Sequence, residues 1–118
     1  METPQPIRDL IHAWDDARAA ADADRLAALV AADAVLLAPS DDSVRGRAAI
    51  AAYFRAQLPV SERDQPRRAP RTFYFFPPLV HATATATGRH GEKHSALDVL
   101  VRQTDGGYLF ACSSWTWG

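Results

Sequence analysis

Residues 79–117 read LVHATATATGRHGEKHSALDVLVRQTDGGYLFACSSWTW, and this stretch decides the fold. It is rich in β-branched and aromatic residues, which favour strands. The turn formers GRHG at 88–91 and DGG at 105–107 divide it into three strands joined as hairpins. The preceding segment TFYFF at 72–76 predicts a further strand, which ends at the pair Pro77-Pro78. We therefore expect an antiparallel sheet in the second half of the chain.

The first half of the chain predicts helices. Apolar residues recur at helical spacing in three segments, residues 6–21, 23–32 and 47–58. Residues 35–38 predict a short strand before the turn-forming segment PSDDSVRG at 39–46, and the polar residues 60–71 predict a loop. Helices followed by antiparallel strands are typical of the α+β class, in which helices pack on one face of a curved sheet.

The composition is that of an ordinary globular protein. The 118 residues are 47% hydrophobic and 23% charged, which suits one compact domain over residues 1–118. A net charge of −1 and a pI near 6.4 argue against binding to nucleic acid. The sequence lacks an apolar run of about 18 residues that could cross a membrane. Cys112 is the one cysteine, so no disulfide forms within the chain, and a cytoplasmic location is expected.

The order of elements and several motifs resemble the nuclear transport factor 2-like superfamily, which includes ketosteroid isomerase and the SnoaL-like polyketide cyclases. The matching features are Trp14 on the first helix, ADRLAAL at 23–29, DAVLLAP at 33–39, GRAAIAAYF at 46–54 and the long terminal hairpins. The resemblance covers nearly the whole chain. It implies a cone-shaped fold in which a curved antiparallel sheet wraps around the N-terminal helices and encloses a pocket. The superfamily mixes enzymes with binding modules, so the resemblance implies no single activity.

The functional residues of ketosteroid isomerase carry over only in part. The position of its general base is Ala38, the position of its oxyanion-binding tyrosine is Trp14, and that of a supporting tyrosine is Phe54. The protonated aspartic acid of its oxyanion hole has a counterpart in Asp98. The resemblance therefore implies that steroid-type isomerisation by the same machinery is absent, and that any chemistry centres on Asp98.

Asp98 interrupts the apolar sequence ALDVLV at 96–101, where a carboxylate costs free energy unless it is paired or neutral. A turn centred between residues 89 and 90 would pair His81 with Asp98, Thr83 with Ala96 and residue 85 with residue 94. A His81–Asp98 pair could act as a general base, with the carboxylate orienting the imidazole. The alternative is a structural polar pair with no catalytic role.

We expect further substrate-binding side chains on the same pocket face. These are Trp14, Phe54, Thr83, His94, Phe110, Cys112 and Ser114, of which the last three require a three-residue DGG loop. No metal site is predicted, because His90 and His94 lie across a turn and a strand, and no cofactor motif is present. The predicted function is cofactor-independent acid–base chemistry, as isomerisation, cyclisation or elimination, on a small hydrophobic carbonyl compound. The alternative is a non-catalytic small-molecule-binding or dimerisation module on the same fold.

The opposite, outer face of the sheet is expected to be apolar. It would carry Leu97, Val99 and Val101, with Trp115 and Trp117 alongside. Such side chains would be exposed in a monomer. We therefore predict a homodimer that covers the outer face.

Overall fold

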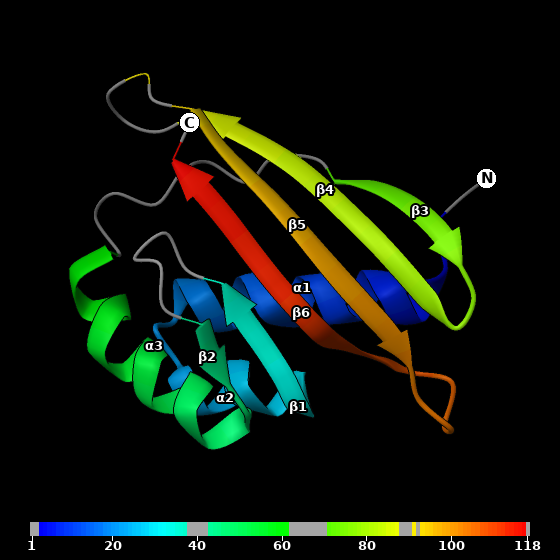
Figure 1. Ribbon diagram of the computed structural model, residues 1–118, viewed down its shortest axis with the longest axis horizontal. Coiled ribbons are helices and arrows are strands. Elements are labelled where there is room, and N and C mark those ends of the chain that lie inside the picture. Colours follow the sequence, from blue (N-terminus) through cyan, green and yellow to red (C-terminus); the bar gives the residue numbers. More distant parts are fainter. Residues whose placement is uncertain (1–2, 38–42, 62–70, 88–90, 92, 118) are drawn as a thin grey trace.

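A computed structural model describes residues 3–37, 43–61, 71–87, 91 and 93–117 (Figure 1). The elements, in chain order, are α1 (Gln5–Ala19), α2 (Ala23–Ala28), β1 (Val30–Leu37), β2 (Ser43–Arg45), α3 (Arg47–Ser61), β3 (Thr72–Phe76), β4 (Leu79–Thr87), β5 (Lys93–Arg102) and β6 (Tyr108–Trp117). The strands form one sheet in the order β2-β1-β6-β5-β4-β3. The predicted α+β class is confirmed, as is the curved sheet with N-terminal helices on one face.

Helix α1 crosses the sheet on its inner face, which is the far side of the sheet in Figure 1. Its apolar residues Ile7, Leu10, Ile11, Trp14 and Ala17 are all buried, as their spacing of three and four residues predicts. Pro6 stands in the first turn, where a missing N–H costs nothing. Burial of one apolar stripe therefore fixes which side of α1 meets the sheet.

The segment after α1 differs from its prediction in three ways. Helix α2 ends at Ala28, and β1 starts at Val30, five residues before the predicted strand. The turn-rich segment contains a short strand, β2, which pairs with the end of β1. Helix α3 continues past Pro59 to Ser61. Turn formers thus surround β2 without preventing its pairing.

All strand pairs are antiparallel except β1 with β6, which is parallel. This pair joins the two halves of the chain in the middle of the sheet. A bulge interrupts β6, because the consecutive residues Val99 and Leu100 of β5 pair with Cys112 and Phe110. Ala111 is therefore the extra residue, and the alternation of inner and outer side chains along β6 shifts by one residue there.

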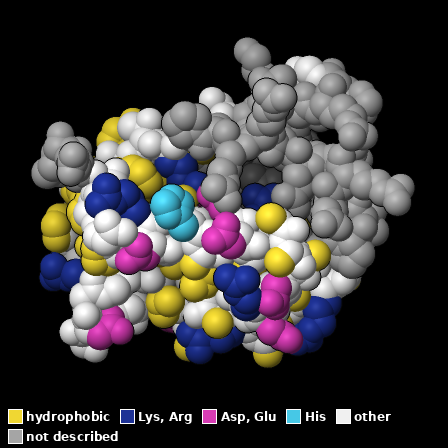
Figure 2. Space-filling model, turned by 180° about the vertical axis from the view of Figure 1, so that it is seen from behind, with side chains coloured by type: hydrophobic (Ala, Val, Ile, Leu, Met, Phe, Trp, Pro, Cys, Tyr) yellow, Lys and Arg dark blue, Asp and Glu magenta, His cyan; other side chains and the backbone are white. Residues whose placement is uncertain are grey.

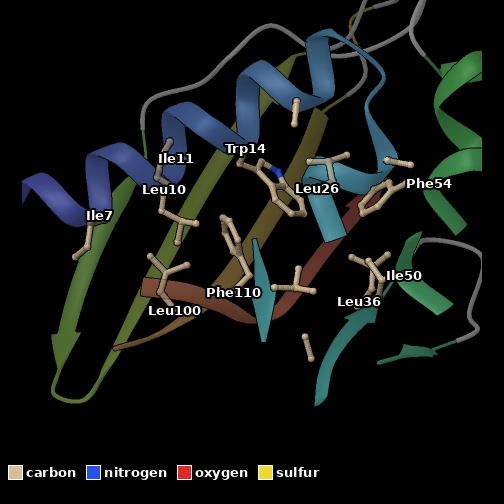
Figure 3. Close-up of a cluster of buried hydrophobic side chains, with 14 of the residues drawn as sticks. Ile7, Leu10, Ile11, Trp14, Leu26, Leu36, Ile50, Phe54, Leu100 and Phe110 are labelled. Atoms are coloured by element: carbon tan, nitrogen blue, oxygen red, sulfur yellow. The ribbon is translucent and has the colours of Figure 1, made fainter. Parts of the chain in front are cut away.

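The core lies between α1 and the sheet. Trp14 packs against Phe54 and Phe110, with ring centroids 5.8 Å and 4.5 Å apart. Figure 3 shows these rings pointing toward one another from α1, α3 and β6, with Leu26 beside them. Each of the three aromatic residues is buried. The aromatic residues therefore join both halves of the chain into one hydrophobic cluster.

Candidate functional site

The register of the β4–β5 hairpin decides which side chains reach the inner face. Ala82 lies opposite Asp98 and His81 lies opposite Val99. Thr87 pairs with Lys93, so residues 88–92 connect the strands, an odd number where the prediction assumed an even one. The predicted His81–Asp98 pair is wrong, because a shift of one residue moves a side chain to the other face. His81 instead contacts the Phe76 ring, with centroids 5.1 Å apart.

Asp98 is the buried acid of the inner face, with 6% of its surface exposed. The Ser113 hydroxyl donates a hydrogen bond of 2.6 Å to its Oδ1 atom from the adjacent strand β6. Its Oδ2 atom lies 4.0 Å from Nε of Arg71, which directly precedes β3. One carboxylate oxygen is therefore held by the sheet, and the other faces a guanidinium group.

Arg71 also approaches Asp15 on α1. Its Nη1 and Nη2 atoms lie 3.5 Å and 3.4 Å from the two carboxylate oxygens of that residue. Arg18, one turn further along α1, interacts electrostatically with Asp15, Arg71 and Asp98. We call these four residues together with Ser113 the Asp98 cluster. It joins α1, the start of β3, β5 and β6.

Burial controls the protonation of this cluster. It raises the pKa of Asp98, against the opposing effects of the Ser113 hydrogen bond and of the Arg71 and Arg18 charges. Burial also lowers the pKa of Arg18, although the charge of Asp15 opposes this shift. Asp98 is therefore a carboxyl group that gains a proton more readily than an exposed aspartate does.

Solvent reaches the inner face close to Asp98. Ala84 and Ala96 pair with each other one step beyond the buried pair of Ala82 and Asp98. Both are only half-buried, although they share the inner face. Asp98 thus stands at the border between the packed core and the accessible part of the inner face.

The other predicted pocket residues divide between the two faces and the core. Thr83 pairs with Leu97 on the outer face. Cys112 and Ser114 pair with Val99 and Leu97, so the bulge in β6 places both on the outer face as well. These three residues do not join Asp98. Ser113 has the inner position that was predicted for Cys112 and Ser114.

Trp14, Phe54 and Phe110 do lie on the inner side, where they pack against one another in the core. His94 pairs with Ala86 and thus has an inner register position, but its side chain lies outside the described residues. Ala38 also lies outside them. Trp115 pairs with Ala96 and Trp117 with His94, so both take inner rather than the predicted outer register positions.

Three charged residues of the Asp98 cluster were missed by the sequence reasoning. Asp15 and Arg18 follow Ile11 and Trp14 at a spacing of four, so the helical period places them beside the buried stripe of α1. That signal was available. Arg71 is one of several arginines in a polar segment, and nothing in the sequence distinguishes it. The inner position of Ser113 could not be predicted without the bulge in β6.

The helix-bearing face, turned toward the viewer in Figure 2, carries basic, acidic and hydrophobic side chains next to one another. Within the described ranges, no three His, Cys, Asp or Glu side chains are grouped to hold a metal ion. No described helix is long and apolar enough to span a membrane.

Solved structures with a similar fold are named after different functions, some as enzymes and others as assembly domains. A candidate ketosteroid isomerase from Shewanella frigidimarina has a TM-score of 0.81 at 13% identity, over 95% of each chain. The CaMKII hub from S. rosetta has a TM-score of 0.77 at 13% identity, over 100% of each chain. An NTF2-like protein with a cystatin-like fold from Novosphingobium aromaticivorans has a TM-score of 0.76 at 18% identity, over 96% of this chain and 80% of that one. At these identities the likeness concerns the fold alone.

Sequence comparisons locate the chain in a family. No curated protein sequence matches it significantly. A family model described as the SnoaL-like domain matches residues 7–113, which is most of the chain. These residues run from Ile7 in the first turn of α1 to Ser113 in the middle of β6, and they include all five residues of the Asp98 cluster. This protein therefore belongs to the SnoaL-like domain family.

Proposed function

We propose that this protein is a cofactor-independent enzyme in which Asp98 moves a proton at the carbon next to a carbonyl group of a small hydrophobic metabolite. The observation that carries the proposal is the placement of Asp98. Its carboxyl group is buried on the inner face, with Oδ1 bonded to Ser113 and Oδ2 toward Arg71. A buried acid at the edge of the accessible inner face suits acid–base work.

The proposed step uses one carboxylate. Ionised Asp98 takes the proton through Oδ2, and the electron pair of the broken C–H bond forms the carbon–carbon double bond of an enolate. The carbonyl oxygen gains the negative charge, which the Arg71 guanidinium stabilises. Protonated Asp98 then returns the proton to the same carbon or to another carbon of a conjugated system. The second outcome is an isomerisation.

The raised pKa of Asp98 supports this role. A carboxylate with an ordinary pKa is a weak base at neutral pH. Burial makes the carboxylate of Asp98 more basic, and Arg71 and Arg18 keep the ionised form accessible. An acid–base catalyst works best when its pKa approaches the working pH. Similarity in fold to a candidate ketosteroid isomerase is consistent with proton transfer next to a carbonyl group.

The test is hydrogen–deuterium exchange at the carbon next to a carbonyl group. We would follow cyclohexanone and 2-decalone in D₂O by proton NMR. The wild type should exceed the buffer rate, and Asp98→Asn should lose about 100-fold or more of the excess. The matched control is Asp33→Asn, which makes the same change at an exposed position of β1. Equal rates for Asp98→Asn and the wild type would overturn the proposal.

A non-catalytic ligand-binding role is the second candidate. It is favoured by the position of His81, which leaves Asp98 without the predicted imidazole partner. In that case Asp98 and Arg71 would hold a ligand without transferring a proton. Binding of a ketone with no exchange above the buffer rate would select this candidate.

We also propose self-association through the outer face. Leu37, Tyr74, Phe76, Leu79 and Leu97 are exposed large hydrophobic residues, and their pairings place all five on that face. Among them, Leu97 has 44% of its surface exposed. A second copy of the chain could cover this surface through a two-fold contact. A CaMKII hub among the similar folds fits a scaffold that supports assembly.

A further inference from the structure

We propose that Arg18 and Arg71 bind the carboxylate of a small organic acid, so that the ligand of the Asp98 cluster is a keto acid rather than a neutral ketone. The inference rests on the proposed function in placing the carbonyl group of that ligand beside Asp98. It goes beyond that function in naming the charged group that the site selects.

Arg71 is held without a short hydrogen bond. Its side chain is 15% exposed, so its guanidinium group is largely removed from water. Its contacts with Asp15 measure 3.4 Å and 3.5 Å, and its contact with Asp98 measures 4.0 Å. Charge-assisted N–H···O bonds are normally about 2.7–2.9 Å long. Its two hydrogen bonds to Asp15 use two of its five N–H donors, so the guanidinium has donors available for another oxygen atom.

Arg18 is the second guanidinium group with available donors. Its side chain makes no hydrogen bond or ion pair with any residue in the described ranges, although it is half-buried. Its charge interacts with Asp15, Arg71 and Asp98, which places it within the same cluster. A guanidinium group carries five N–H donors, and leaving them unpaired away from water costs free energy. A ligand oxygen would remove that cost.

The charge of the cluster favours an anion with one negative charge. Among the described residues of the cluster, two arginines and two ionised aspartates sum to zero, and uptake of a proton by Asp98 would leave one positive charge. A single carboxylate restores neutrality, whereas a phosphate dianion would exceed it. The planar carboxylate also matches the fork of N–H groups on a guanidinium.

Binding is then linked to pH. Asp98 is faced by Asp15 and Arg18 from α1, Arg71 from the start of β3, Ala82 from β4 and Ser113 from β6. Burial, and after it the charge of Asp98, raises the pKa of the Cys112 thiol on the other face of β6. Burial dominates among these effects and raises the pKa of Asp98. An anion prefers the protonated form, so affinity should fall as pH rises through that pKa.

The experiment compares two probes that share the keto chain, one with an ionised carboxylate and one with a neutral methyl ester. We would titrate 4-oxopentanoate and its methyl ester into the full chain and follow backbone amide shifts by NMR. The acid should bind at least tenfold more tightly than the ester. Arg18→Gln and Arg71→Gln should each remove this preference, and Arg8→Gln, an exposed arginine of α1, should retain it. Arg71→Lys keeps the charge without the fork, and it should weaken the preference in a chain that remains folded by circular dichroism.

Equal affinity for acid and ester, or a preference that survives both glutamine variants, would overturn the carboxylate site. Failure of the proposed function looks different. In that case the acid still binds through Arg18 and Arg71, but neither the acid nor a neutral ketone exchanges protons above the buffer rate. Exchange of a neutral ketone without preference for the acid would reject the carboxylate site and leave the role of Asp98 intact.

Discussion

Ser113 Oγ donates a hydrogen bond of 2.6 Å to Asp98 Oδ1, across a pairing that places the two residues directly opposite each other on β5 and β6. Both residues are buried. The hydroxyl group compensates one oxygen of a carboxyl group that would otherwise lack a partner inside the sheet. It also leaves Oδ2 as the atom that meets Arg71 or a ligand.

Replacement of Ser113 by alanine should raise the pKa of Asp98 further, because the Ser113 hydrogen bond favours the ionised form. The unfolding free energy should fall by about 1–3 kcal/mol, the cost of an unsatisfied buried polar group. Carbon-13 NMR titration of the Asp98 carboxyl group and urea denaturation measure the two effects. Ser113→Thr retains the hydroxyl group and should preserve the wild-type pKa. An unchanged pKa in Ser113→Ala would contradict the role given to the hydrogen bond.

Asp98 should make the stability of the protein depend on pH. An acid whose pKa is raised by folding binds more protons in the folded chain than in the unfolded one. The unfolding free energy should therefore fall as pH rises from about 4, the unfolded value, through the raised pKa of Asp98. Asp98→Asn lacks this contribution and should gain stability relative to the wild type across that window. A difference between the two proteins that stays constant with pH would exclude this source of pH dependence.

Trp14 should contribute more to stability than any surface residue of α1. It is 4% exposed and packs against Phe54 and Phe110. Trp14→Ala should lower the unfolding free energy by about 3–5 kcal/mol, through lost burial and the cavity it leaves. Trp14→Phe should cost less, because a ring remains against both neighbours. Chemical denaturation measures both, with the exposed residue His12 changed to alanine as the control. A cost for Trp14→Ala below that of the control would refute the core role.

Leu97 should be the position most sensitive to charge if the outer face is an interface. Leu97→Glu would place a carboxylate on the outer face, between Thr83 and Ser114 of the neighbouring strands, where a partner copy would have to bury it. We expect a dimer for the wild type and a monomer for the variant by multi-angle light scattering at micromolar concentration. Ala48→Glu puts the same group on an exposed position of α3 and should leave the mass unchanged. A monomeric wild type at these concentrations would reject self-association through this face.

The helices and the strand order were predictable where periodicity and turn formers are strong, as in α1 and in the strands around GRHG and DGG. The number of residues in the β4–β5 connection and the extra residue in β6 were not predictable. One residue in the β4–β5 connection separates a histidine facing Asp98 from a histidine on the outer face. One extra residue, Ala111, moves Cys112 and Ser114 away from Asp98 and brings Ser113 to it. Hydrophobic pattern does not specify either feature, because both faces of these strands tolerate small and apolar residues.

The charged part of the site was predictable only in pieces. Asp98 was identifiable because an acid within ALDVLV is unusual in a covered strand. Asp15 carried a signal in its helical position, but its meeting with Arg71 depends on packing between segments 56 residues apart in the chain. A contact between segments so far apart in the chain follows from tertiary packing, and no local sequence pattern indicates it.

The parallel pairing of β1 with β6 also bears on how the chain folds. The middle of the sheet cannot form until residues 108–117 are available to pair with residues 30–37. Contacts over such a sequence distance are slow to close. A nascent chain that has not yet produced β6 can pair β1 only with β2, and β5 only with β4, so it contains two separate fragments of sheet. The strand that completes the sheet also delivers Ser113 to Asp98, so cooperative folding and assembly of the site should occur in the same kinetic step.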